Sequence, residues 1–278
     1  MTVERDTIFS VFKYMVYVLL AMNVYWFFAE EFAAAALQFP NGVTLATLIE
    51  AYAATIDTAA WVVLLLMFEL ETYILDDRHF TRRVTWTLHF FRILCYAFIV
   101  YAFYGYAINL AFVESALPLG GMSDLCSLAG GQWVYAVDFD EYVAITASNC
   151  RELSSADTFL RFTGMQAVVD ASGHAAIKGL AWIDVMNAGV WLLVVLVLET
   201  DVRLQERGRY EGTALLISNT LKIVLYGLLL FAAIYWGIKG DFVDFWDAFL
   251  WLVAFVFIEL NVFEWRQEAK EDALAESG

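Results

Sequence analysis

Three apolar stretches of this sequence carry acidic or amide side chains at the same spacing. The stretches "DTAAWVVLLLMFELE", "NAGVWLLVVLVLETD" and "DAFLWLVAFVFIELN" begin at Asp57, Asn187 and Asp247 and align without gaps. A carboxylate in so apolar a setting needs a basic partner, a bound cation or a proton, because an unpaired charge is costly there. The chemistry that these residues offer is therefore ion pairing, cation binding or proton binding.

The alignment defines the pattern [DN]-x3-W-x7-E-x-[EDN], which has four polar or aromatic positions. Its members are, position by position, Asp57, Asn187 and Asp247; Trp61, Trp191 and Trp251; Glu69, Glu199 and Glu259; and Glu71, Asp201 and Asn261. A second pattern, [FL]-[KR]-x3-Y, occurs in "FKYMVY", "FRILCY" and "LKIVLY", and its basic residues are Lys13, Arg92 and Lys222. Because the two patterns alternate along the chain, they indicate an internal repeat of three units.

The basic residues and the first set of glutamates are predicted to lie at similar depth in a membrane. At a rise of about 1.5 Å per residue, both fall roughly 7–12 Å inside the membrane boundary. Since intramembrane charges usually pair with one another, the predicted ion pairs are Lys13–Glu69, Arg92–Glu199 and Lys222–Glu259. Such pairs would act as a structural clamp on helix register or as a gate or proton-linked switch. The third alternative is that the long side chains reach the interface without pairing.

The remaining polar positions form a stripe on each helix. Asp57, Trp61 and Glu71 fall within about 80° of one another on a helical projection, and the other two copies behave alike. If the three stripes converge, they make two polar rings separated by a tryptophan layer, which is a common arrangement in cation pathways. The alternative is that the tryptophans anchor the helices at the interface and that the Asp and Asn residues cap them.

Composition predicts the elements that must position these residues. Of the 278 residues, 62% are hydrophobic and 17% are charged, against about 45–50% and about 25% in soluble domains. A membrane span needs about 20 mostly apolar residues, and six segments qualify, roughly 8–28, 58–75, 86–113, 185–200, 214–236 and 245–263. The predicted fold is an all-α integral membrane protein with six transmembrane helices, built as three two-helix repeats with pseudo-threefold symmetry.

The repeats give the domain organisation. The first repeat is predicted at residues 1–84, the second at 85–205 and the third at 206–265, followed by a cytoplasmic tail at 266–278. The second repeat holds an insertion at 114–181 that contains Cys126, Cys150 and "QWVYAVDFDEYVAI". The β-branched and aromatic residues of that segment predict a strand or hairpin, and an oxidising compartment would let the two cysteines pair. The insertion is therefore predicted to be a small disulfide-stapled outer subdomain.

The distribution of charge predicts the orientation. Twelve of the 16 Lys and Arg residues fall on the side of the two termini or at the span ends there. The positive-inside rule then places both termini in the cytoplasm and the 114–181 loop in the periplasm or outside the cell. We expect the inner membrane of a bacterium. The outer side is strongly acidic, which would attract cations or simply keep the outer loops soluble.

Several chemistries are excluded by what the sequence lacks. It contains no P-loop, no dinucleotide-binding glycine pattern, no nucleophile elbow and no His or Cys cluster at metal-ligand spacing. We therefore expect no catalytic residue, no metal, no cofactor and no nucleic-acid partner. Two main functions remain. One is a channel or permease for a small cation or proton along the pseudo-threefold axis. The other is a non-catalytic scaffold or accessory subunit that forms a homo-oligomer or joins partner membrane subunits. An intramembrane enzyme ranks third.

Overall fold

The computed structural model describes residues 2–39, 41–71, 81–120, 124–156, 158–207, 210 and 212–255, with side chains from residue 9 onward except 202, 205 and 206. Two compact units divide the chain. One is Val24–Leu225, and the other combines Met1–Asn23 with Tyr226–Gly278.

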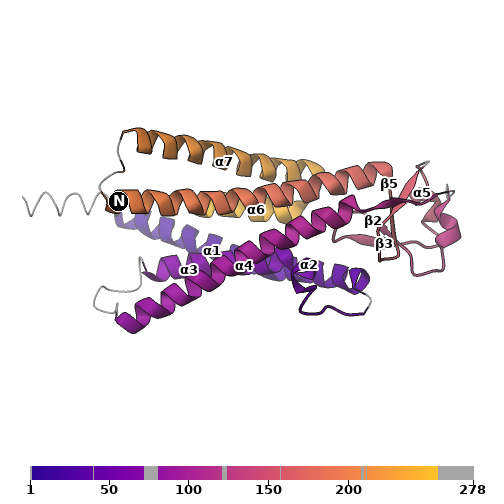
Figure 1. Ribbon diagram of the computed structural model, residues 1–278, viewed down its shortest axis with the longest axis horizontal. Coiled ribbons are helices and arrows are strands. Elements are labelled where there is room, and N and C mark those ends of the chain that lie inside the picture. The colour runs from indigo at the N-terminus through magenta and orange to yellow at the C-terminus, as the bar shows by residue number, and fades with distance from the viewer. Residues whose placement is uncertain are drawn as a thin grey trace, which may run out of the picture. The chain divides into compact units, whose positions relative to one another are not determined.

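Helices make up most of the described chain (Figure 1). They are α1 (Thr2–Gln38), α2 (Leu48–Ala51), α3 (Ala53–Glu69), α4 (Arg82–Glu114), α5 (Cys150–Leu153), α6 (Ala171–Glu206) and α7 (Thr213–Lys239). A further helical stretch covers 242–255, after a turn at Gly240, whose φ of 91° suits glycine. Pro118 lies in β1, outside all these helices, as expected from the loss of a backbone donor at proline.

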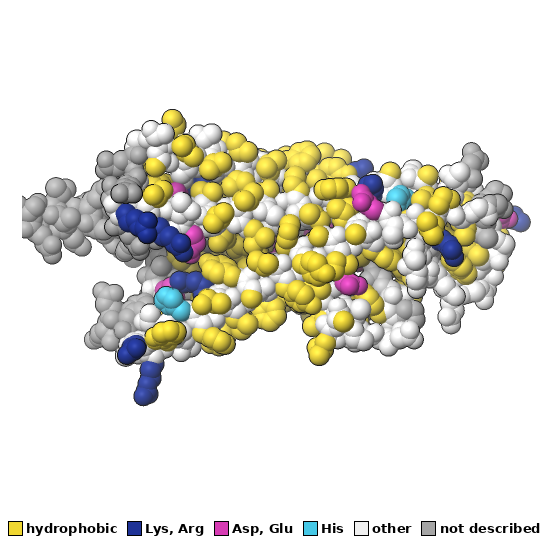
Figure 2. All heavy atoms as spheres, in the orientation of Figure 1, with side chains coloured by type: hydrophobic (Ala, Val, Ile, Leu, Met, Phe, Trp, Pro, Cys, Tyr) yellow, Lys and Arg dark blue, Asp and Glu magenta, His cyan; other side chains and the backbone are white. Residues whose placement is uncertain are grey.

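Four helical segments are long and apolar enough to cross a membrane, within the described ranges. They are Phe9–Gln38, Arg82–Glu114, Ala171–Asp201 and Thr213–Lys239. Figure 2 shows hydrophobic side chains along these helices, and large apolar residues such as Ile93 and Ile223 are exposed. Exposed apolar surface of this extent is typical of a protein that contacts lipid. The second and sixth predicted spans run past residues 71 and 255, where the described ranges stop, so six spans remain a prediction.

The insertion between α4 and α6 is not all-helical, which corrects the expected all-α fold. It contains β1 (Leu117–Pro118), β2 (Val134–Ala136), β3 (Tyr142–Ala144), β4 (Phe159–Arg161) and β5 (Ala167–Asp170). They form one sheet in the order β1-β4-β5-β2-β3. Strands β2 and β5 are parallel and the other pairs are antiparallel. The predicted hairpin is confirmed as β2–β3, whereas strands β1, β4 and β5 were not predicted.

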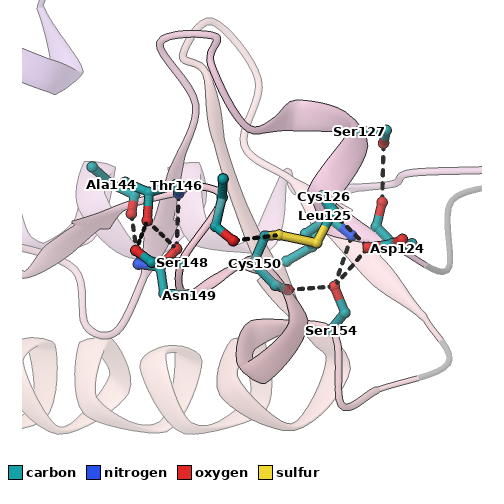
Figure 3. Close-up of a disulfide and its surroundings, with 11 residues drawn as sticks. Asp124, Leu125, Cys126, Ser127, Ala144, Thr146, Ser148, Asn149, Cys150 and Ser154 are labelled. Atoms are coloured by element: carbon teal, nitrogen blue, oxygen red, sulfur yellow. Dashed lines mark hydrogen bonds between the residues drawn. A yellow bond between two sulfur atoms is a disulfide. The ribbon is translucent and has the colours of Figure 1, made fainter.

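We call residues 115–170 the sheet domain. It is shorter than the predicted 114–181 insertion because α4 continues through Glu114 and α6 begins at Ala171. The predicted disulfide is present: Cys126 in the 3₁₀ helix Leu125–Leu128 is bonded to Cys150 at the start of α5 (Figure 3). Beside it, Ser154 Oγ accepts a hydrogen bond from the Leu125 N–H at 2.8 Å and donates one to the Cys150 carbonyl at 2.6 Å.

A continuous apolar core joins the sheet domain to the helices that flank it. Leu110 and Val113 of α4 and Ile177 of α6 pack in one cluster with Val134 and Val169 of the sheet. A second cluster surrounds Cys150 inside the domain. The sheet domain is therefore packed onto the ends of α4 and α6 as part of the same unit.

Candidate functional site

One polar cluster of the helices centres on Asp201 of α6. Asp201 is only 3% exposed, and its Oδ2 lies 2.8 Å from Lys222 Nζ. The same oxygen accepts hydrogen bonds from Ser218 Oγ at 2.7 Å and from the Tyr210 hydroxyl at 3.1 Å. Lys222 and Ser218 are four residues apart on α7, so both reach one carboxylate. Three donors on a buried carboxylate join α6 firmly to α7.

A second ion pair joins two residues that align with Asp201 and Lys222 in the sequence patterns. Arg92 Nη2 of α4 lies 2.5 Å from Glu71 Oε2, at the end of the helical segment that contains α3. In the sequence patterns Glu71 aligns with Asp201, and Arg92 aligns with Lys222. Each pair thus connects the last acidic position of one predicted repeat to the basic position of the next.

These partners differ from the predicted pairs of Arg92 with Glu199 and of Lys222 with Glu259. Residues two apart on a helix point about 160° away from each other, so only one acidic residue of each Glu-x-[acid] pair can face the next helix. At α6 that residue is Asp201. Glu199 instead accepts a hydrogen bond from the Tyr96 hydroxyl of α4 and lies 3.9 Å from Arg203 on its own helix. Glu71 and Asp201, predicted to line a ring, are therefore ion-pair partners. Glu259 and Asn261 lie outside the described residues.

The third predicted pair, Lys13–Glu69, stays a prediction. Each residue is 3% exposed, which is very low for a charged side chain. Lys13 Nζ also lies 5.0 Å from the centre of the Tyr14 ring. Lys13 and Glu69 belong to different units of the chain.

Two of the three repeated tryptophans contact each other. The rings of Trp61 on α3 and Trp191 on α6 have centroids 5.8 Å apart and planes inclined by 54°, and both residues are buried. Aromatic pairs at this distance add to the stability of a packed interface. Trp251 is also buried, within the other unit. All three aligned tryptophans are therefore buried.

The residues predicted for the outer ring have different surroundings. Asp57 and Asn187 are half-buried, and within the described ranges the buried Asn187 Oδ1 has no hydrogen-bond partner. Asp247 accepts a hydrogen bond from Asn23 Nδ2 at 2.7 Å. The side chain of Trp251, one turn later, donates to the same carboxylate. Asn23 is 0% exposed and Asp247 is half-buried, so α1 and the 242–255 helix share a part-buried polar contact.

The junction of the sheet domain with α6 depends on Asp170. Its Oδ1 accepts from the Gly173 N–H and from Ser172 Oγ, both at 2.6 Å, so it caps α6. Its Oδ2 accepts from the Tyr135 hydroxyl at 2.8 Å. Burial alone would raise the pKa of Asp170, but these hydrogen bonds outweigh it and lower the pKa. Burial and the bond to Asp170 raise the pKa of Tyr135 to about 12.

No family model, curated protein or solved structure matches this chain. Nothing about its function is therefore carried over from a relative. Among the residues that the structure describes, no group of three or more His, Cys, Asp or Glu side chains is placed to hold a metal ion.

Two functional contacts were missed by the sequence patterns. Glu31 of α1 accepts hydrogen bonds from the backbone N–H groups of Ala54 (2.8 Å) and Thr55 (3.0 Å) and from Thr55 Oγ1 (2.5 Å). It therefore supplies the cap that α3 lacks locally. The other is Asn23, whose partner is 224 residues away. Its signal was an amide in an otherwise apolar segment, at a position where the other copies have Ala102 and Ala232.

Proposed function

We propose that this protein is a non-catalytic membrane scaffold. It anchors the sheet domain rigidly at the membrane, and its intramembrane polar groups fix the helices to one another. The observation that carries the proposal is the Asp201 cluster, in which Lys222, Ser218 and Tyr210 all donate to one buried carboxylate.

The ion pairs leave little for a permeating cation to bind. A pathway carboxylate must exchange its ligands for the ion. Asp201 can bind a cation only if Lys222, at 2.8 Å, is displaced, and Glu71 is held in the same way by Arg92. Breaking a buried pair of this kind typically costs about 3–5 kcal/mol. The geometry therefore favours a clamp over an ion pathway.

The connection between the sheet domain and the helices also supports a scaffold. The core that runs from Leu110 through Val169 to Ile177 is continuous, the Asp170 cap fixes the start of α6, and the disulfide closes the domain. A domain held at so many points keeps one orientation relative to α4 and α6. A domain with a fixed orientation can hold one surface in place for a partner protein.

The proposed architecture is six spans in three repeats with pseudo-threefold symmetry. Two observations support it. The first is that the pattern of burial repeats. Each residue in 221–230 has the same degree of burial (buried, half-buried or exposed) as the residue at the same place in 91–100, and the same holds for 183–191 compared with 53–61. The ion pairs Arg92–Glu71 and Lys222–Asp201 occupy equivalent positions. The positive-inside rule supports cytoplasmic termini and an external sheet domain, and the proposed location is a bacterial inner membrane.

The experiment that tests the scaffold is site-specific photocrosslinking in native membranes. A photoreactive residue replaces Val137, which is 47% exposed in the sheet domain, and in a separate variant Ile223, which is 73% exposed on α7. A scaffold predicts a discrete protein adduct from position 137, formed with a second copy or another membrane subunit, and lipid adducts from position 223. If position 137 and the nearby exposed Val143 crosslink to no protein, the proposal fails.

The second candidate is a pathway for a small cation or proton, and one observation favours it. Asp247 is held by Asn23 and Trp251, which are both neutral, and not by a basic residue. A carboxylate of this kind can bind and release a proton or cation without breaking an ion pair.

A further inference from the structure

The carboxylate of Asp247 differs from the other helical carboxylates in the nature of its partners. Asn23 Nδ2 donates to Asp247 Oδ1 at 2.7 Å, and the Trp251 side chain donates as well. Among the described groups, no basic side chain acts on this carboxylate, whereas Asp201 has Lys222 at 2.8 Å. A carboxylate in an apolar bundle that lacks a counter-charge tends to bind a proton.

The amide of Asn23 has one buried atom that lacks a hydrogen bond. Asn23 is 0% exposed, and within the described part of the chain its Oδ1 has no hydrogen-bond partner. A primary amide and a carboxylic acid are complementary, because the amide N–H donates to the acid carbonyl while the acid O–H donates to the amide oxygen. The first of these bonds is present, and Asn23 Oδ1 is the acceptor that the second one needs.

We propose that Asn23 and Asp247 form a proton-binding site inside the helical bundle. One proton from water adds to Oδ2 of the Asp247 carboxylate, which forms an O–H bond and neutralises the carboxylate. This O–H donates to Asn23 Oδ1 and completes a cyclic acid–amide pair. On release the proton returns to water, and Asn23 and Trp251 stabilise the anion. No group is oxidised or reduced.

The assignment does not depend on which way the Asn23 amide is turned. If nitrogen and oxygen are exchanged, two oxygen acceptors face each other at 2.7 Å. A proton must then lie between them, because two acceptors cannot form a hydrogen bond without one. In the orientation present, Asn23 Nδ2 donates to the ionised and to the protonated carboxylate alike, and protonation of Asp247 adds the second bond.

The charged groups of neighbouring elements have other contacts. At the start of the 242–255 helix, the Asp244 N–H donates to Asp241 Oδ1 at 3.3 Å. Lys239 at the end of α7 is exposed, with Nζ 5.6 Å from the centre of the Tyr235 ring. On α1, Lys13 precedes Asn23 by ten residues, which is about 15 Å along a helix. None of these acts on Asp247.

The amide of this site is present in only one of the three predicted repeats. Where the first repeat has Asn23, the sequence pattern places Ala102 and Ala232 in the others, and both alanines are fully buried. Neither can donate to a carboxylate. Asp57, aligned with Asp247, therefore provides a matched control that has no amide at the corresponding position.

The test is infrared difference spectroscopy of the full-length protein in lipid across a pH titration. The wild type should show the carbonyl band of a protonated carboxylic acid that shifts in D₂O and disappears at high pH. Asp247→Asn should lose this band, and Asp57→Asn should retain it. Asn23→Ala should keep the band but shift its frequency, because the acid loses its amide partner.

Two outcomes would overturn the proposal. The first is a spectrum in which Asp247→Asn removes no band that titrates, and the second is an acid band that sodium ions abolish at constant pH, which would make the ligand a metal cation. Asparagine at 247 can still pair with Asn23, so the variant should fold, and circular dichroism checks this. If Asp247→Asn does not fold, the frequency shift of the acid carbonyl band in Asn23→Ala tests the proposal in its place. The result does not require a partner protein, so it is independent of the scaffold proposal.

Discussion

Lys222 Nζ of α7 lies 2.8 Å from Asp201 Oδ2 of α6. The lysine side chain is 16% exposed and the aspartate side chain is 4% exposed. We expect Lys222→Met to leave Asp201 buried without its counter-charge and to lower the free energy of unfolding by about 3–5 kcal/mol. Thermal or denaturant unfolding in detergent measures this. Lys239→Met is the matched control, because Lys239 is an exposed lysine on the same helix and should cost little.

A double-mutant cycle separates the pair from unrelated packing. Lys222→Met combined with Asp201→Asn should cost much less than the sum of the two single changes, because no buried charge remains. Additive effects would mean that the two side chains do not interact.

The Glu31 cap should be essential for the start of α3. Glu31→Gln replaces a carboxylate that accepts from Ala54, Thr55 N–H and Thr55 Oγ1. We expect a loss of about 1–2 kcal/mol, which is typical for a helix cap. Amide hydrogen exchange should become faster at residues 54 and 55, and unchanged exchange there would contradict the cap. Thr55→Val removes only the hydroxyl contact and should have a smaller effect.

The contact of α4 with α2 should not tolerate a methyl group at Gly105. A Cβ there would lie 2.8 Å from both the Cγ1 and the backbone oxygen of Ile49. We expect Gly105→Ala to destabilise the protein by about 1–3 kcal/mol, as overpacking does. Gly227→Ala is the control, because a Cβ at Gly227 would meet no atom within 4 Å and alanine favours helix. Equal effects of the two changes would contradict the close contact.

The stability of the sheet domain should depend on pH through Asp170. Its pKa is lowered in the folded state by hydrogen bonds that outweigh burial, so its contribution is present above its unfolded pKa of about 4 and is lost as the pH falls through the lower folded pKa. Asp170→Asn should therefore be less stable than the wild type at neutral pH. The difference should narrow as the pH falls below about 4. A difference that stays constant down to strong acid would refute the ionised cap.

Sequence patterns predicted the apolar helices, the disulfide and the β2–β3 hairpin because each depends on local features. A membrane-spanning helix needs a run of apolar residues. The two cysteines in the insertion have few other cysteines with which they could pair. The partner of Arg92 could not be predicted in the same way. Glu71 and Glu199 are both acidic residues on helical segments that contact α4, and only the packing of the three helices decides that Glu71 reaches Arg92 while Glu199 reaches Tyr96.

Long-range contacts account for the other differences. Asn23 and Asp247 are 224 residues apart, and Glu31 caps a helix that starts 22 residues later, at Ala53. Neither contact has a local signature. Strand β1 pairs with β4, which lies far along the chain, as the pairing of Leu117 with Arg161 shows, and such a long-range pairing has no local pattern in the sequence.

Cation and proton flux across proteoliposomes tests the scaffold account most directly. Purified full-length protein is reconstituted, and proton and potassium flux are followed with fluorescent indicators under an imposed gradient. The account predicts flux equal to that of empty vesicles, both for the wild type and for Asp201→Asn, because Asp201 and Glu71 are held in ion pairs. Flux well above empty vesicles that Asp201→Asn or Asp57→Asn reduces would contradict the account and establish the pathway instead.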